Sequence, residues 1–155
     1  MRPPLSLLVF TLVAAVACSG DSTGPGATYE SIAGNYSGAM TGMSQGIALD
    51  GTFSLTVDQN RGTTSGTYGI AGTLYDGTTS LDVAGTGTLT GTVAAGNNPS
   101  VNITVRTPMC PNYQAHFSGT YDVPNRRLTM IGPIEFFNDS CTVVLSYPST
   151  IVLTR

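Results

Sequence analysis

Few side chains in this 155-residue chain are of the types that usually carry catalysis. His116 is the single histidine, and no serine occupies a nucleophile motif of the form Gly-x-Ser-x-Gly. General acid–base chemistry near neutral pH most often uses a histidine, which a neighbouring acid orients. His116 falls on the polar side of an alternating segment and has no acid close to it in the sequence. We therefore expect His116 to be exposed and to have no catalytic role.

The acidic and amide side chains suggest two further kinds of site. Glu135 and Asp139 could form the carboxylate pair of a glycoside hydrolase, but one irregular loop should hold both as solvated charges. Asp58, Asn60, Asn138 and Asp139 offer oxygen ligands for calcium, although no EF-hand or nonapeptide repeat orders them. One histidine without a Cys-x-x-Cys pair cannot complete a zinc site. The sequence predicts no catalytic residues, no metal and no cofactor, and a hydrolase is the least favoured function.

The N-terminal residues have the features of an export signal. Arg2 precedes an apolar run over residues 5–16, and the segment ends in Ala15-Val16-Ala17-Cys18. This ending resembles the lipobox of bacterial lipoproteins. In that family the cysteine thiol receives a diacylglyceryl group, the signal is cut before it, and the new amine is acylated, for example with palmitate. The resemblance implies that residues 1–17 are a signal peptide and that Cys18 is the lipidated N-terminus.

The following residues, 18–27, suit a flexible tether, because residues 19–26 include no apolar side chain. Several acyl chains would anchor such a protein stably in a membrane. Ser19 after the cysteine resembles an outer-membrane sorting address. Small residues at Ala15 and Ala17 also suit ordinary signal peptidase, which would leave a soluble protein with a free Cys18. We expect a lipoprotein of the bacterial cell envelope.

The two remaining cysteines, Cys110 and Cys141, are expected to form a disulfide. Both would lie in an oxidising compartment after export, and their flanking residues are typical of loops and strand entries. Closing the loop of about 30 residues between them should add roughly 3.5 kcal/mol of stability.

Residues 28–155 are expected to form one all-β domain, because apolar and polar residues alternate with a period of two. In residues 47–57 the apolar set should point inward and the polar set outward. Similar alternation, interrupted by turn residues, predicts eight or nine strands near 32–40, 47–57, 68–74, 81–93, 101–105, 113–121, 128–131, 141–147 and 151–154. The inward set of residues 47–57 is Ile47, Leu49, Phe53, Leu55 and Val57, and the outward set is Thr52, Ser54 and Thr56.

Short connections between these strands favour a small antiparallel up-and-down β-barrel of about eight strands. Glycines within strands suit the tight curvature of such a barrel, and they include Gly66, Gly72, Gly85, Gly87 and Gly91. A two-sheet β-sandwich has similar strand numbers and spacing, so it stays the alternative.

Three short motifs carry a resemblance to known barrels: Gly34-Asn35-Tyr36, residues 51–55 (GTFSL), and Gly66-Thr67-Tyr68. These are similar to strand motifs of the calycins, the group of small barrels that includes avidins and lipocalins. Biotin binding is not implied, because avidins surround biotin with tryptophans and this chain has none. The chain also resembles bacterial lipoproteins with Gly-Thr-rich strands, two late cysteines and a Leu-Thr-Arg ending, a group that implies no particular activity.

The charge composition limits the possible partners. Charged residues are 10% of the chain, all six basic residues are arginine, and the formal net charge is -3. Such a chain lacks the clustered basic residues that nucleic acids or anionic membrane surfaces require, so we expect no nucleic-acid partner.

Two non-catalytic functions are left open. A binding and interaction module would use the loops expected at residues 109–113 and 133–139 to anchor an unknown protein partner, with Phe136 and Phe137 as an exposed apolar pair in the second loop. Alternatively, the barrel interior would bind a small hydrophobic ligand. The candidate lining for that ligand is Phe53, Leu55, Tyr68, Phe117 and Tyr121, which could equally form an ordinary core.

Overall fold

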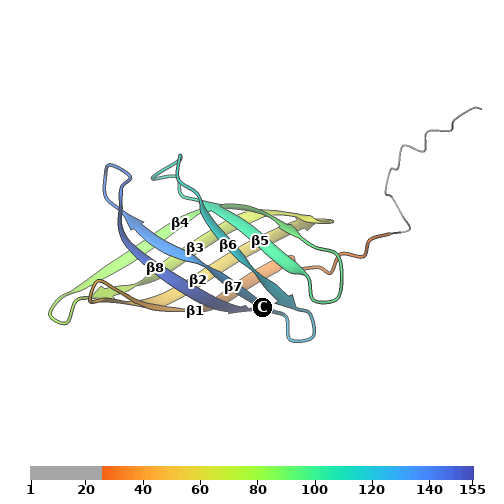
Figure 1. The fold of residues 1–155 in the computed structure, drawn as a ribbon, viewed down its shortest axis with the longest axis horizontal. Helices are drawn as coiled ribbons and strands as arrows, with labels where there is room; N and C mark the ends of the chain where they lie inside the picture. Colours follow the sequence, from red (N-terminus) through yellow and green to blue (C-terminus); the bar gives the residue numbers. More distant parts are fainter. Residues whose placement is uncertain (1–25) are drawn as a thin grey trace, which may run out of the picture.

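The computed structural model of the chain describes residues 26–155. The predicted signal peptide, Cys18 and most of the predicted tether lie outside the described residues. Eight β-strands form one closed barrel in which each strand pairs antiparallel with the next (Figure 1). The strands are β1 (Gly34–Ser44), β2 (Ile47–Asn60), β3 (Thr63–Tyr75), β4 (Ser80–Val93), β5 (Ser100–Arg106), β6 (Ala115–Asp122), β7 (Arg127–Phe137) and β8 (Val143–Thr154).

The up-and-down barrel is therefore confirmed, and the sandwich alternative is wrong. Closure occurs between the first and last strands, where Ser37 of β1 pairs with Thr154 of β8. Gly38 allows this approach, because a Cβ atom at its position would collide with the carbonyl oxygen of Val152 in β8. A glycine is required where two backbones lie so close together.

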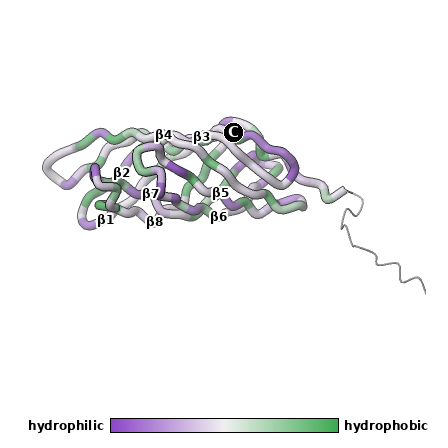
Figure 2. The backbone as a smooth tube through the Cα atoms, turned by 90° about the horizontal axis from the view of Figure 1, so that it is seen from above, coloured by the Kyte–Doolittle hydropathy of each residue, from purple (hydrophilic) through white to green (hydrophobic). Residues whose placement is uncertain are grey.

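The barrel interior follows the alternation of the sequence, and hydrophobic residues recur along the strands (Figure 2). In β2, Phe53, Leu55 and Val57 are each 2% exposed, whereas Thr52 and Thr56 are exposed. The predicted orientation of this strand is confirmed. A shift of one residue would turn every apolar side chain of β2 towards solvent, so the buried face fixes the register.

The two ends of the barrel differ. We call the end with connections 45–46, 76–79, 107–114 and 138–142 the mouth end, and the end with connections 61–62, 94–99 and 123–126 the base end. The chain enters at the base end, where Tyr29 pairs with Gly96. Ile32 is fully buried there.

Side-chain hydrogen bonds hold the entering segment in place. The hydroxyl of Tyr36 donates to the carbonyl oxygen of Ile32 at 2.7 Å. The side chain of Gln59 accepts from the amide of Ile32 at 2.6 Å and donates to the carbonyl of Glu30 at 3.1 Å. The base end is thus packed and hydrogen-bonded.

The structure corrects two strand boundaries. Residues 141–154 were expected to form two strands, but β8 is continuous through Pro148. It tolerates this proline because Pro148 pairs with Pro133 of β7, so neither residue leaves an amide donor unsatisfied. Residues 133–137 were expected in a loop, yet they belong to β7, because residues 143–149 continue the ladder beside them.

One burial prediction was also wrong. In the expected strand 81–93, the alternation of Leu81 and Val83 with Asp82 predicts a buried Leu81, but its side chain is 63% exposed although it lies on the same face of β4 as Val83. The tip of the β3–β4 hairpin projects beyond the neighbouring strands (Figure 1), so nothing covers Leu81 there.

Candidate functional site

The mouth end of the barrel contains an apolar cavity of about 140 Å³. Its floor includes Phe53 of β2 and Phe117 of β6, which are 2% and 3% exposed. Their ring centroids are 5.8 Å apart and the planes are tilted by 52°. Gly132 of β7 makes room for the Phe117 ring, because a Cβ atom at that position would collide with it. The floor is therefore aromatic and closely packed.

The walls of the cavity come from the strands on either side of this floor. Tyr68 of β3 stacks on Phe53 with 6.1 Å between centroids and 12° between planes. Ile70 lies on the same strand, and Ile134 and Phe136 of β7 form the opposite side. All four are buried or half-buried because they face the barrel interior. The space is thus surrounded mainly by ring and aliphatic carbon.

The rim of the cavity includes residues of the β5–β6 connection. Met109, which is 69% exposed, and the half-buried Tyr113 both border the cavity. Tyr113 packs against Phe137 at the end of β7, with 4.4 Å between ring centroids and 62° between planes. The rim is thus partly a flexible methionine and partly a packed aromatic pair.

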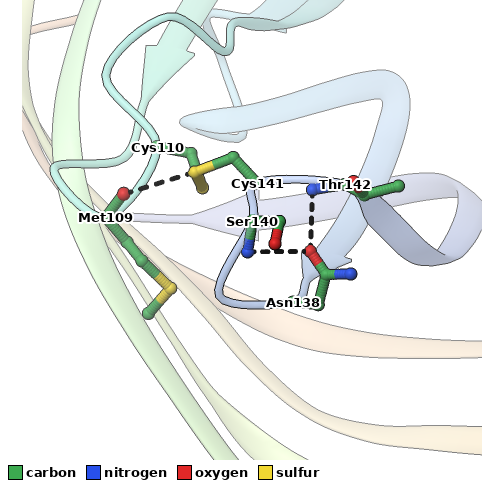
Figure 3. Close-up of a disulfide and its surroundings, with 6 residues drawn as sticks. All are labelled: Met109, Cys110, Asn138, Ser140, Cys141 and Thr142. Atoms are coloured by element: carbon green, nitrogen blue, oxygen red, sulfur yellow. Dashed lines mark hydrogen bonds between the residues drawn. A yellow bond between two sulfur atoms is a disulfide. The ribbon is translucent and has the colours of Figure 1, made fainter.

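The disulfide between Cys110 and Cys141 lies beside this rim and is confirmed (Figure 3). The two Cα atoms are 5.5 Å apart, and the bond joins the β5–β6 connection to the β7–β8 connection. Asn138 orders the second connection, since its side-chain oxygen accepts from the amides of Ser140 and Thr142 at 3.1 and 2.9 Å. The covalent bond therefore joins the connection that holds Met109 and Tyr113 to the connection that directly follows Phe137.

The candidate lining residues divide into two groups. Phe53, Tyr68 and Phe117 border the cavity. Leu55 and Tyr121 are each 2% exposed in the packed core and do not border it. Tyr121 instead packs edge-on against Tyr36, with 6.3 Å between ring centroids. Alternation correctly predicts that all five candidate side chains point inward. Their position along the barrel axis decides which of them border the cavity and which belong to the packed core.

Phe136 and Phe137 were expected in an exposed partner loop, and this placement is wrong. Both lie in β7 and are half-buried, because a bulge between them lets both rings pack on neighbours. Phe136 contacts Tyr147 edge-on at 6.0 Å, and Phe137 contacts Tyr113. Both border the cavity, so their side chains belong to its wall and rim.

The residues considered for catalysis or metal binding are dispersed. His116 is exposed on the outside of β6, where its Nδ1 lies 3.0 Å from the hydroxyl of Thr104. Glu135 lies in β7 rather than in a loop, and it accepts a hydrogen bond from Ser146 at 3.2 Å. Asp139 lies in the β7–β8 connection. Across residues 26–155, no three His, Cys, Asp or Glu side chains group closely enough to hold a metal ion.

The four residues considered as calcium ligands lie at opposite ends of the barrel. Asp58 and Asn60 are near the base-end turn between β2 and β3, whereas Asn138 and Asp139 are at the mouth end. The topology therefore prevents them from forming one site.

The mouth end is acidic. Among the described residues, its strand halves and connections carry five carboxylates and one arginine, which are Asp50, Asp76, Asp82, Glu135 and Asp139 with Arg106. The other described arginines lie at the base end, and they are Arg61, Arg126, Arg127 and Arg155. The mouth end thus favours cationic over anionic partners.

The cavity lining is mainly apolar and includes a few polar groups. Burial raises the pKa of the Tyr68 hydroxyl above its ordinary value of 10.0, so this group is protonated near neutral pH. Thr107 and the half-buried Glu135 also border the cavity. The cavity can therefore bind an apolar group and offer it a small number of polar contacts.

Sequence reasoning missed several residues of the cavity. Val105, Ala115 and Ile134 are buried and border it, and their inward alternation could have identified them as candidates. Met109 and Tyr113 belong to a segment expected as a partner loop, and Tyr113 was also expected to begin a strand, but neither was expected to border a cavity. The structure places both in the β5–β6 connection, beside the disulfide between Cys110 and Cys141.

Comparison with known proteins adds no further information about this site. Within residues 26–155, no helix has the length and apolar character needed to cross a membrane. No protein-family model, no curated protein and no solved structure matches the chain.

Proposed function

We propose that this protein is a binding module whose mouth-end cavity receives one apolar group of a partner molecule. The observation that carries the proposal is the cavity itself, about 140 Å³ in volume and walled by Phe53, Tyr68, Phe117 and Phe136. A well-packed barrel of this size has few internal spaces larger than a water molecule. An aromatic space that stays open at one end of the barrel, while the other end is packed, is suited to an external ligand.

The size of the cavity indicates what kind of group fits. Engineered apolar cavities of about 150 Å³ remain dry and bind benzene or xenon. Drug-sized ligands occupy pockets of roughly 300–1,000 Å³. The cavity, at about 140 Å³, therefore suits a single ring or a short branched aliphatic group. The remainder of a larger partner would lie outside, near Met109 and Tyr113.

The cellular setting of this function is the bacterial envelope, with Cys18 as the lipid-anchored residue. The support for this part is the Ala15-Val16-Ala17-Cys18 sequence. A calycin-like barrel is compatible with the eight-stranded closed topology. Because the chain enters the barrel at the base end, an anchored molecule would present its mouth end away from the membrane. Intact-mass analysis of the mature protein tests this part, since a Cys18 without acyl groups contradicts it.

Binding of toluene, a single-ring probe, tests the cavity. NMR spectra recorded during a toluene titration should show saturable shifts for the residues around Phe53 and Phe117. A dissociation constant of about 1 mM, which corresponds to about 4 kcal/mol, is expected for so small a ligand. Ala115→Leu should abolish binding, because Ala115 is buried on the cavity wall and the larger side chain fills the space.

The matched control is Ala71→Leu, which makes the same change on the exposed outer face of β3. This variant should bind toluene as the wild type does. Absence of saturable shifts in the wild type, or equal binding by Ala115→Leu, would contradict a ligand-binding cavity.

A further inference from the structure

Strand β4 has a free edge next to the cavity. It pairs with β3 along its whole length, from Ser80 opposite Tyr75 to Thr92 opposite Thr63. On its other side it pairs with β5 only from Thr88 to Val93, because β5 ends at Arg106. Within the part of the chain that the structure describes, no strand pairs with the second side of residues 80–87. This leaves a row of backbone donors and acceptors available to another strand.

The free edge carries one charged side chain, Asp82, and otherwise lacks the lysines, prolines and bulges that usually prevent strand addition. Natural sheets protect such edges with lysine, proline, bulges or a covering loop. Residues 80–87 (SLDVAGTG) include no lysine or proline, and all of them pair with β3 in unbroken register. The edge is therefore long and regular enough to accept a further strand.

The edge and the cavity form one continuous surface. Ala84, whose side chain is exposed, and Gly85, on the inner face, both border the cavity. Across the gap the cavity is bordered by Thr107 and Met109, which follow the end of β5. A strand placed along residues 80–87 would therefore run past the cavity opening. Because alternate side chains of a strand point to one face, such a strand could place a side chain in the cavity.

Charge adds a further constraint on the partner. Asp82 lies on the free edge itself and is exposed, and Asp76 lies at the tip of the same hairpin. Asp50 lies two strands away on the same row, since it pairs with Thr73 and Thr73 pairs with Asp82. Arg106 is the one described arginine at this end of the barrel. These carboxylates complement a positively charged chain and repel an acidic one.

We infer that the partner is an extended, basic polypeptide segment, which adds a strand to the free edge of β4 and places one apolar side chain in the cavity. This inference rests on the proposed function, because it assigns the apolar group to a peptide. The cavity volume of about 140 Å³ matches a group the size of one side chain, such as the ring of phenylalanine. Backbone hydrogen bonds to β4 would supply affinity, and the cavity and the carboxylates would supply specificity.

Selection from a random twelve-residue peptide library displayed on phage tests the inference, with the Ala115→Leu variant used for counter-selection. Recovered peptides should contain a large apolar residue flanked by Lys or Arg. Replacement of that apolar residue by Ala should weaken binding at least about tenfold, since it removes the group that fills the cavity. Failure to recover peptides that distinguish the wild type from Ala115→Leu would overturn the inference.

N-methylation of a recovered peptide tests strand addition directly. In a strand bound at an edge, alternate amides point towards the protein and the others towards solvent. Methylation of one alternate set should reduce affinity at least about tenfold, and methylation of the other set should change it by less than about threefold. Equal effects of the two sets would exclude pairing with β4.

Asp82→Asn tests the charge, with Asp58→Asn at the base end as the matched control. The first variant should weaken peptide binding about threefold and the second should not, and added salt should reduce the difference. The toluene titration separates the two proposals. Toluene binding without any selectable basic peptide would leave the cavity function intact and refute the peptide partner. Edge-dependent peptide binding that is unaffected by Ala115→Leu would refute the insertion of a side chain into the cavity, which is part of the inference, whereas loss of toluene binding by the wild type would refute the cavity function itself.

Discussion

Replacement of Phe53 by alanine should lower the free energy of unfolding by about 3 to 4 kcal/mol. The ring is 2% exposed, stacks on Tyr68 at 6.1 Å and contacts Phe117 at 5.8 Å. Loss of the buried ring removes about 1.5–3 kcal/mol of transfer free energy, and each aromatic contact adds about 0.5–1.5 kcal/mol. One side of the ring already borders the cavity, so the cost should lie in the lower part of the usual range for Phe→Ala.

Urea unfolding followed by far-ultraviolet circular dichroism measures this cost, since the chain has no tryptophan to report by fluorescence. The midpoint of thermal unfolding should fall by roughly 10–15 °C. The matched control is Thr52→Ala on the adjacent exposed position of β2, which should change the free energy by less than about 0.5 kcal/mol.

A double-mutant cycle with Phe117→Ala isolates the contact between the two floor rings. The coupling should be about 0.5–1.5 kcal/mol, because the rings touch in the folded state. A cost for Phe53→Ala below about 1 kcal/mol, or equal to that of Thr52→Ala, would refute the assignment of Phe53 to the cavity floor.

Further perturbations test other parts of the structure. Reduction of the disulfide between Cys110 and Cys141 should lower the unfolding free energy by about 3.5 kcal/mol and leave the far-ultraviolet spectrum of the barrel intact. Complete loss of the strand signal would show instead that the barrel cannot fold without the disulfide. Hydrogen bonds from the amides and hydroxyls of Thr78 and Thr79 lower the pKa of Asp76 well below its ordinary value of 3.8, so its contribution to stability is complete above that value and is lost as the pH falls towards the folded-state pKa. The stability difference between wild type and Asp76→Ala should therefore shrink in acid, and an NMR titration midpoint near 3.8 would contradict the turn. Gly38→Ala should weaken the contact of β1 with β8, because the added Cβ atom would collide with β8, and amide hydrogen exchange in β8 should become faster. Unchanged exchange rates in β8 would contradict this close approach of the two strands. His116→Ala should leave binding of toluene and of selected peptides unchanged, and any loss above about threefold would assign it a role at the mouth.

Alternation along the sequence determined most of the fold. Because side chains on a strand alternate between two faces, the apolar residues of residues 47–57 specified both the strand and its inward side, and the structure agrees with each. Short connections specified the up-and-down order, and two late cysteines specified the disulfide. These features are local or depend on simple chemical pairing, so they can be read without coordinates.

The tertiary structure decided what local patterns do not contain. Phe53 and Leu55 have the same period and similar burial, yet only Phe53 borders the cavity, because its height in the barrel depends on strand register. Phe136 and Phe137 depart from alternation, and only pairing with β8 shows that a bulge turns both into the wall and rim. The free edge of β4 exists because β5 ends at Arg106 while β4 continues to Ser80. Sequence patterns report which face of a strand is apolar, whereas cavities and free edges arise from the relative lengths and heights of strands, which only the closed barrel fixes.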